Sequence, residues 1–148
     1  MHSLQYSRSA VKRSLRARQH LIAIDVQVEE LARMSAATPV IAMGSDVFMK
    51  YAAGNYRPYS LFVFCDAAAI PEAKSLKLHQ YVKNMAVVSK HVAAHARKQG
   101  PDDPASKIFF VQIDMAHSRD IFMALGVQNL PWALHIAPDT RWYALTSN

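Results

Sequence analysis

Cysteine and glycine are scarce in this sequence of 148 residues, and each scarcity excludes a class of site. The single cysteine, Cys65, excludes an internal disulfide, a Cys-x-x-Cys redox pair and a cysteine-based zinc site. Only four glycines are present, which argues against the glycine-rich loops that hold phosphate groups. Apolar runs are all shorter than a membrane span. Without a GxSxG, HExxH or Gly-Lys-Ser/Thr motif, the sequence lacks the common hydrolase and nucleotide-binding signatures.

Acidic residues are missing from the N-terminal segment. The formal net charge is +6, and the first 20 residues carry five bases and no acid: Arg8, Lys12, Arg13, Arg16 and Arg18. The rest of the chain is almost neutral, which argues against a nucleic-acid-binding surface on the folded body. Three interpretations of the basic segment stay open: a solvated helix, a basic arm that contacts an anionic partner, or a mitochondrial transit-like segment.

The stretch from residue 57 to residue 82 combines a strand, a short loop and the start of a helix. Residues 59–65 are almost continuously apolar, which predicts a strand buried on both faces of a mostly parallel sheet. Pro71 and Glu72 suit the first turn of the following helix. Ligands in α/β folds gather at the carboxyl end of a central strand, so this loop is the expected site. Cys65 is predicted to be a small buried apolar residue rather than a nucleophile.

The other elements are predicted from hydrophobic periodicity and from turn residues. We expect helices over residues 11–34, 46–53, 72–98 and 119–125, strands over 40–43, 108–113 and 132–136, and a hairpin partner for the last strand over 141–145. Ser45 and Ser118 are predicted N-caps, and Gly126 a helix C-terminal residue. The long helix should bury an apolar stripe, namely Leu78, Tyr81, Val82, Met85, Val88, Val92 and Ala96.

The order of these elements predicts an α/β thioredoxin-like fold, with a central mixed sheet flanked by helices and an N-terminal helical extension. Pro131 stands directly before a strand and after a βαβ crossover. A cis-proline at this point of a thioredoxin-like protein lies against the loop that follows the central strand, so we hypothesise a cis peptide bond at Pro131. The predicted organisation is a basic arm over residues 1–20 and a single thioredoxin-like domain over residues 21–148.

Several short segments, in a fixed order, resemble one protein family. They are VEEL at 28–31, TPVIAM at 38–43 with Phe48, RPYSLFVF at 57–64, IFFVQID at 108–114, DIF at 120–122 with Leu125, and Leu130-Pro131. Together these segments resemble the lumenal domain of the thioredoxin-like accessory subunit of the oligosaccharyltransferase complex. Relatives of that subunit include the tumour-suppressor-candidate and magnesium-transporter forms.

The resemblance implies a thioredoxin fold that faces the lumen of the endoplasmic reticulum. In the family, a Cys-x-x-Cys motif forms transient mixed disulfides with nascent polypeptides, and a groove binds them, which delays folding so that nearby sequons are glycosylated. Counted from Phe64, the two cysteines should fall near Ala73 and Leu76, where neither side chain can form a thiolate. The four membrane helices that follow the domain in the family are also absent, so we expect either an excised domain or a soluble descendant.

The best candidate for a binding site is Leu130-Pro131-Trp132. If Pro131 is cis, the backbone of Leu130 faces the loop, and thioredoxin-like proteins hold extended peptide there by strand addition. The residues of the predicted peptide- or partner-binding patch are Ile70, Pro71, Ala73, Leu76, Leu130, Pro131 and Trp132. The patch is either an apolar docking surface or simply core with a covered edge.

Histidines on the predicted long helix are candidate metal ligands. His91 and His95 are four residues apart on the predicted long helix, a spacing that suits two ligands. Because no cysteine can complete the site, we expect a solvated pair, and we expect His117 to be a loop residue. No metal or cofactor is therefore predicted.

Two functions remain open. The first is a redox-inactive domain that binds polypeptide or protein non-covalently in support of N-glycosylation, in the lumen of the endoplasmic reticulum. The second is a structural accessory subunit of a large complex, a mitochondrial one included, that uses the inert fold as a scaffold. The basic first 20 residues and the missing cysteines and membrane helices favour the second function. In both cases we expect no thiol-disulfide oxidoreductase activity.

Overall fold

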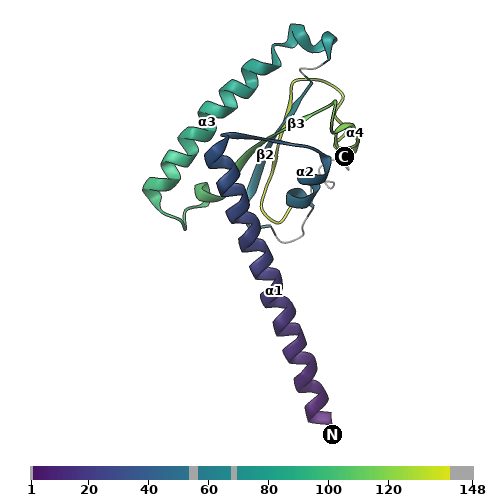
Figure 1. The fold of residues 1–148 in the computed structure, drawn as a ribbon, viewed down its shortest axis with the longest axis vertical. Coiled ribbons are helices and arrows are strands. Elements are labelled where there is room, and N and C mark those ends of the chain that lie inside the picture. The colour runs from purple at the N-terminus through teal and green to yellow at the C-terminus, as the bar shows by residue number, and fades with distance from the viewer. Residues whose placement is uncertain (1, 54–56, 68–69, 141–148) are drawn as a thin grey trace.

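Four strands form one mixed sheet in the computed structural model, which describes residues 2–53, 57–67 and 70–140. The strands are β1 (Val40–Met43), β2 (Ser60–Asp66), β3 (Ile108–Asp114) and β4 (Trp132–Ile136). Their order across the sheet is β1-β3-β2-β4; β3 is parallel to both of its neighbours, and β4 is antiparallel to β2. This arrangement confirms the predicted α/β thioredoxin-like fold (Figure 1).

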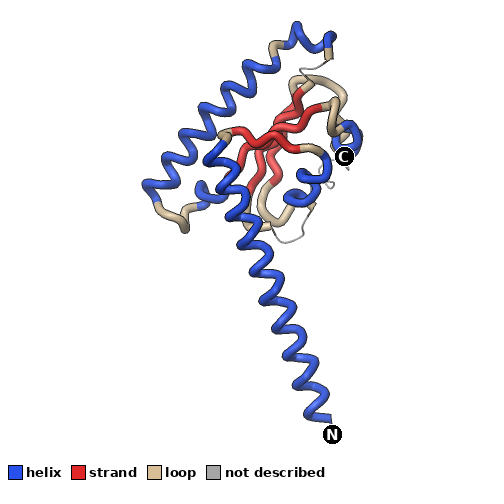
Figure 2. Tube along the Cα trace, viewed as in Figure 1, coloured by secondary structure: helices blue, strands red, loops and turns tan. Residues whose placement is uncertain are grey.

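Helices cover both faces of this sheet (Figure 2). They are α1 (His2–Ala37), α2 (Ser45–Ala52), α3 (Leu78–Gln99) and α4 (Arg119–Ala124), with two short 3-10 helices, η1 (Pro71–Leu76) and η2 (Pro104–Lys107). Leu61, Val63 and Cys65 of β2 pack in one cluster with buried residues of α1, α2 and α4. Phe64, which points to the other face, packs with Leu78 of α3. Successive side chains of β2 therefore point alternately to two helical layers, one on each face of the sheet.

Phe62 departs from the prediction that β2 is buried on both faces. Its side chain is 36% exposed, whereas Leu61 and Val63 are fully buried. The Phe62 ring stacks between His135 of β4 and Phe110 of β3, with ring centroids 4.5 Å and 5.3 Å away. Because α3 packs mainly over β1 and β3, it leaves this part of the sheet face accessible.

The predicted long helix is interrupted. Lys77 adopts a left-handed conformation, with φ 53° and ψ 44°, and separates η1 from α3. The predicted stripe on α3 is also partly wrong, because Tyr81 is 44% and Val88 is 50% exposed. The inward side of α3 instead includes Ser89, whose hydroxyl donates a hydrogen bond to the carbonyl of Pro39 at 2.7 Å.

The two serine caps are not formed by their side chains. Gly44 is the N-cap of α2, and the Ser45 hydroxyl donates a hydrogen bond to the Asp120 carboxylate instead, so the predicted Ser45 cap is wrong. Ser118 occupies the N-cap position of α4, but its side chain makes no capping bond. Gly126, with φ 67°, follows the end of α4 as predicted. The predicted hairpin strand over 141–145 lies outside the described residues.

Helix α1 extends well beyond the predicted bounds and projects from the body along its N-terminal part (Figure 1). Gln27 is the first described residue of α1 that hydrogen-bonds to the body, where it meets the carbonyl of Lys50 and the hydroxyl of Tyr59. Further along, Glu30 accepts bonds from Lys50 and Tyr51, and Leu31 is fully buried. No described helix is both long and apolar enough to cross a membrane.

Candidate functional site

Backbone hydrogen bonds hold the residues on either side of the loop after β2. The amide of Met115 donates a hydrogen bond to the Asp66 carbonyl at 2.8 Å, which joins the ends of β2 and β3. The amide of Ile70 donates to the Ala67 carbonyl at 2.9 Å, and the amide of Ala73 donates to the Ile70 carbonyl at 3.0 Å. Helix η1 begins directly after Ile70, with Pro71 in its first turn.

A small apolar cluster lies beneath this loop, on the α3 face of the sheet. Its buried members are Phe64, Ala67, Ala73 and Leu78, and the partly buried residues packed against them are Ile70, Val82, Met85, Met115 and Leu130. The structure therefore brings together three residues of the predicted patch, Ile70, Ala73 and Leu130, although they come from two distant parts of the chain.

The other four residues of the predicted patch face solvent. Pro71 and Pro131 are exposed, Leu76 is 38% exposed, and Trp132 is 36% exposed. Neither Leu76 nor Trp132 belongs to the clusters of described buried residues. The Leu130–Pro131 peptide bond is cis, which confirms the hypothesis from the sequence.

Ala73 and Leu76, where the resemblance predicts the family's cysteines, differ in their surroundings. Ala73 is 7% exposed, whereas Leu76 is 38% exposed. Both lie in a 3-10 helix, and α3 begins only at Leu78, after the left-handed residue Lys77. Reactive thiolates are stabilised at helix N-termini in accessible places. Position 73 offers neither condition, since it is buried and precedes the N-terminus of α3.

Cys65 lies within the sheet, opposite Ile113 of β3 and Trp132 of β4. Its side chain is fully buried, and burial raises the pKa of the thiol to about 12. The thiol is therefore neutral at physiological pH, and only a thiolate attacks a disulfide. The structure places this cysteine as the sequence predicts, as a buried apolar residue.

The polar groups at the carboxyl end of β3 interact with one another. The Asp114 carboxylate accepts a hydrogen bond from the Ala116 amide at 3.0 Å and lies 3.4 Å from Nδ1 of His117, which is an exposed loop residue. A cavity of about 410 Å³ opens beside them. His91 and His95 are exposed on α3, and the described residues contain no group of three or more potential metal ligands.

Arg57, the first residue of the family-like segment over residues 57–64, has a structural role that the sequence analysis did not predict. Its side chain is 1% exposed, and its guanidinium donates hydrogen bonds to the carbonyls of Ala52, Ala137 and Thr140 at 2.7, 2.8 and 2.6 Å. It thereby holds the segment after β4 against the end of α2. No sequence pattern marks a buried arginine, because its acceptors are backbone carbonyls, two of which lie about 80 residues further along the chain.

Strand order, helical layers and the cis-proline beside the loop after β2 define a thioredoxin-like domain whose loop carries no cysteine. The sequence family described as OST3 / OST6 family, transporter family, matches residues 29–146, and the chain belongs to this family. The resemblance inferred from short segments is thus confirmed.

Curated plant proteins are similar to the chain. The Arabidopsis thaliana protein named probable dolichyl-diphosphooligosaccharide–protein glycosyltransferase subunit 3A is 28% identical over 111 residues, which cover 74% of this chain and 32% of the relative. The corresponding subunit 3 of Oryza sativa subsp. japonica is 34% identical over 84 residues, or 56% of this chain and 23% of the relative. The chain thus spans about a third or less of the length of these relatives.

Proposed function

We propose that the chain is a redox-inactive, thioredoxin-like domain of an oligosaccharyltransferase accessory subunit, which binds polypeptide or a partner protein non-covalently in support of N-glycosylation. Family membership supports this role, as do the names of the plant relatives. The same relationship favours the lumen of the endoplasmic reticulum, and the comparisons give no support to a mitochondrial location.

The observation that carries the proposal is the chemistry of the loop after β2. Ala73 and Leu76 stand where the resemblance expects cysteines, and the one thiol, Cys65, is fully buried. The loop and the neighbouring cis-proline turn still present apolar side chains to solvent, including Leu76 and Trp132. Apolar contact and backbone pairing therefore remain as the means of binding.

Occupancy of N-glycosylation sites tests this function. In cells that lack the full-length protein, mass spectrometry of glycopeptides should show incompletely occupied sequons, and the wild-type protein should restore them. Leu76→Glu in the full-length protein should restore occupancy poorly, because it places a charge on the proposed apolar surface. Met123→Glu is the matched control, since Met123 is 77% exposed on α4, and Cys65→Ala should restore occupancy as well as wild type. Unchanged occupancy without the protein would contradict the proposal.

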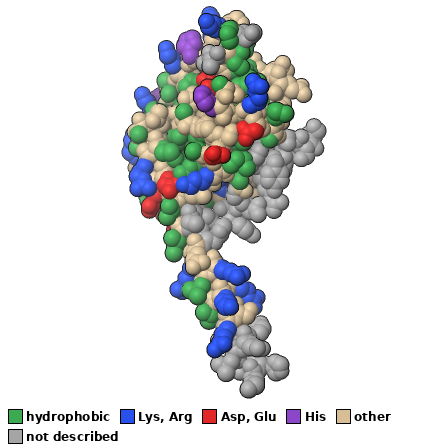
Figure 3. All heavy atoms as spheres, turned by 45° about the vertical axis from the view of Figure 1, so that its right-hand side comes forward, with side chains coloured by type: hydrophobic (Ala, Val, Ile, Leu, Met, Phe, Trp, Pro, Cys, Tyr) green, Lys and Arg blue, Asp and Glu red, His purple; other side chains and the backbone are tan. Residues whose placement is uncertain are grey.

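A structural subunit of a large complex is the second candidate function. The projecting part of α1 favours it, because all five basic residues of the predicted arm are exposed there (Figure 3). In that case a partner should cross-link to residues 8–19 in the purified assembly, and loss of the protein should leave sequon occupancy unchanged. Cell fractionation would then decide between the endoplasmic reticulum and the mitochondrion.

A further inference from the structure

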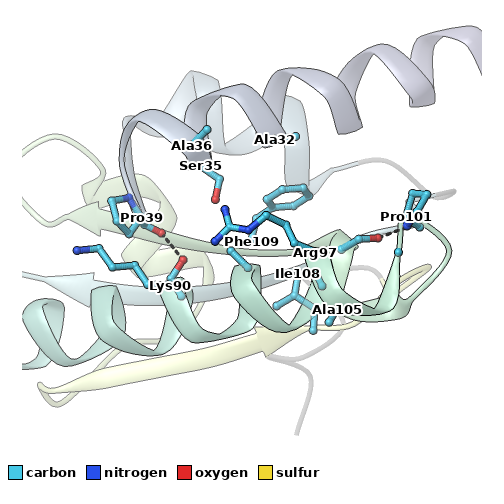
Figure 4. A pocket seen from close by; sticks show the side chains of 15 residues that line it. Ala32, Ser35, Ala36, Pro39, Lys90, Arg97, Pro101, Ala105, Ile108 and Phe109 are labelled. Atoms are coloured by element: carbon cyan, nitrogen blue, oxygen red, sulfur yellow. Dashed lines mark hydrogen bonds between the residues drawn. The ribbon is translucent and has the colours of Figure 1, made fainter.

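A groove separates the C-terminal turns of α1 from the second half of α3 (Figure 4). It encloses a cavity of about 570 Å³, which we call the α1–α3 groove. Its walls and floor include Ala32, Ser35 and Ala36 of α1, Ala93 and Ala96 of α3, and Phe109 of β3. Small side chains on both walls explain the space, because each helix packs on the sheet while neither fills the gap between them.

Two cations line the same groove. Lys90 and Arg97 are exposed residues of α3, and neither forms an ion pair with any residue that the structure describes. The lining includes no acidic side chain. Asp103 is close to the lining residues in sequence but is not one of them, and its carboxylate accepts a hydrogen bond from the Ala105 amide at 2.9 Å. The groove is therefore apolar inside, and within the described part of the chain no acidic side chain pairs with its two cations, which makes it complementary to an apolar, anionic occupant.

The spacing of the cations favours an elongated occupant. Seven residues separate Lys90 from Arg97, which corresponds to two helical turns, or about 10 Å along α3. A lipid with one headgroup would meet only one of the two, and the basic arm of a second copy would be repelled by both. Carboxylates seven residues apart on a helix have the matching separation, and Ala and Ser walls allow close approach of another helix.

We propose that the α1–α3 groove binds an acidic amphipathic helix of a partner protein. This site is distinct from the loop at Pro131, because the groove adjoins the β1 side of the sheet, while Pro131 precedes β4 at the opposite edge. The inference therefore does not depend on peptide binding at Pro131, and both surfaces can be occupied together.

Photo-cross-linking tests the groove in the full-length protein. We would place a benzoyl-phenylalanine at Ala93 in a tagged protein, purify it with its native partners after irradiation, and map the adduct by mass spectrometry. The expected adduct is a partner segment of helical periodicity with acidic residues seven positions apart. The same probe at His95, which is exposed on the other side of α3, should not give this adduct.

Charge reversal supplies the matched comparison. Arg97→Glu should lower the adduct yield at position 93 by about tenfold through like-charge repulsion, whereas Lys98→Glu, the neighbouring exposed residue outside the groove, should leave it within about twofold. Circular dichroism melts would establish that both variants fold. Adducts with lipid, with a second copy or with a non-acidic segment, the absence of an adduct, or equal effects of the two variants would each overturn the proposal.

Discussion

At the residue scale, the Cys65 thiol lies fully buried in the sheet, between β3 and β4. Its pKa is raised to about 12 because burial disfavours the charged thiolate. The same residue type at an accessible helix N-terminus would have a lowered pKa and would react readily. Position in the fold thus makes this cysteine a packing residue.

Thiol labelling checks this assignment. At pH 8, native protein should react with 5,5′-dithiobis(2-nitrobenzoic acid) at least about a hundredfold more slowly than urea-unfolded protein, because both burial and the raised pKa suppress attack by Cys65. The unfolded sample serves as the control for reagent and thiol content. Labelling of the native protein within tenfold of the unfolded rate would mean that Cys65 is accessible.

The raised pKa of Cys65 also predicts a dependence of stability on pH. A group with a higher pKa in the folded state stabilises the fold below its unfolded pKa, and this contribution is lost as pH rises toward the folded value. Between pH 8.5 and 10, urea unfolding of the wild type should lose about 1.5 kcal/mol through Cys65. Cys65→Ala should lack that part of the slope. Burial also raises the pKa of Tyr59, so the wild type and Cys65→Ala should both lose stability at higher pH. If the free energy of unfolding fell equally with pH in the two proteins below pH 10, the role given to the Cys65 thiol would be wrong.

Burial decides the role of Arg57, as it does for Cys65. Burial lowers the pKa of its guanidinium, yet the group donates to three carbonyls from two separate segments. Arg57→Ala should lower the free energy of unfolding by about 3–5 kcal/mol, since it leaves those carbonyls without their donor. Arg57→Lys should lower it less than Arg57→Ala, because the lysine ammonium can still donate to some of the carbonyls. It should not match the wild type, because the ammonium lacks the planar set of donors of the guanidinium.

Lys50 is the matched control for Arg57. It pairs with Glu30 at 3.1 Å, and its side chain is 53% exposed. Chemical denaturation of Lys50→Ala should show a much smaller loss of stability than Arg57→Ala, because solvent screens an exposed ion pair. If Arg57→Ala were no more destabilising than Lys50→Ala, the role given to Arg57 would be wrong.

At the scale of elements, the junction of η1 and α3 is the main local departure from sequence prediction. Lys77 is exposed and left-handed, a conformation that costs side-chain-bearing residues more than glycine. This turn allows Ala73 to enter the small cluster while Leu78 begins α3 in the same cluster. The break therefore shapes the loop where the resemblance predicts the family's cysteines.

Glycine at this junction should be stabilising. Lys77→Gly should raise the free energy of unfolding by about 0.5–1 kcal/mol, because glycine adopts a positive φ without steric strain. Lys74→Gly, within η1, should instead be neutral or destabilising, since it only increases the freedom of the unfolded chain. Thermal and urea melts of both variants provide the measurement. A loss of stability in Lys77→Gly would show that the backbone there is not left-handed.

At the scale of the whole molecule, one helix joins a projecting segment to a folded body. The described side chains of residues 8–19 are exposed, whereas Leu31 of the same helix is fully buried. The apolar contacts that stabilise the fold therefore come from the C-terminal part of α1, with the sheet and the other helices. The charge of the projecting segment is available for partners.

Deletion separates the two parts of α1. Removal of residues 2–19 should change the free energy of unfolding by less than about 0.5 kcal/mol, because the described side chains of that segment make no packing contact with the core. Leu31→Ala should cost about 2–5 kcal/mol, as is usual for a truncated core leucine. Calorimetry of both proteins tests the contrast. A deletion as destabilising as Leu31→Ala would place residues 2–19 within the cooperative fold.

Much of the fold could be predicted from the sequence because buried strands require continuous apolar runs. Residues 59–65 and 108–113 show this pattern, and the structure places β2 and β3 there. The order of strands and helices, with Pro131 before the last predicted strand, then indicated a thioredoxin-like topology. The candidate site was less predictable, since packing after folding decides that Ala73 is buried in the small cluster while Leu76 and Trp132 remain exposed.

The sequence by itself determined three properties of covalent composition. The chain lacks a pair of thiols, its N-terminal segment is basic, and the rest of the chain is nearly neutral. The tertiary structure alone decided that Phe62 is accessible, that Ser45 bonds to Asp120 rather than capping α2, and that Arg57 is buried. It also decided that α1 and α3 leave a groove lined by Lys90 and Arg97, which form no ion pair with the residues that the structure describes. The physical reason is that such features depend on contacts between elements distant in sequence, whereas local patterns specify only each element's period and ends.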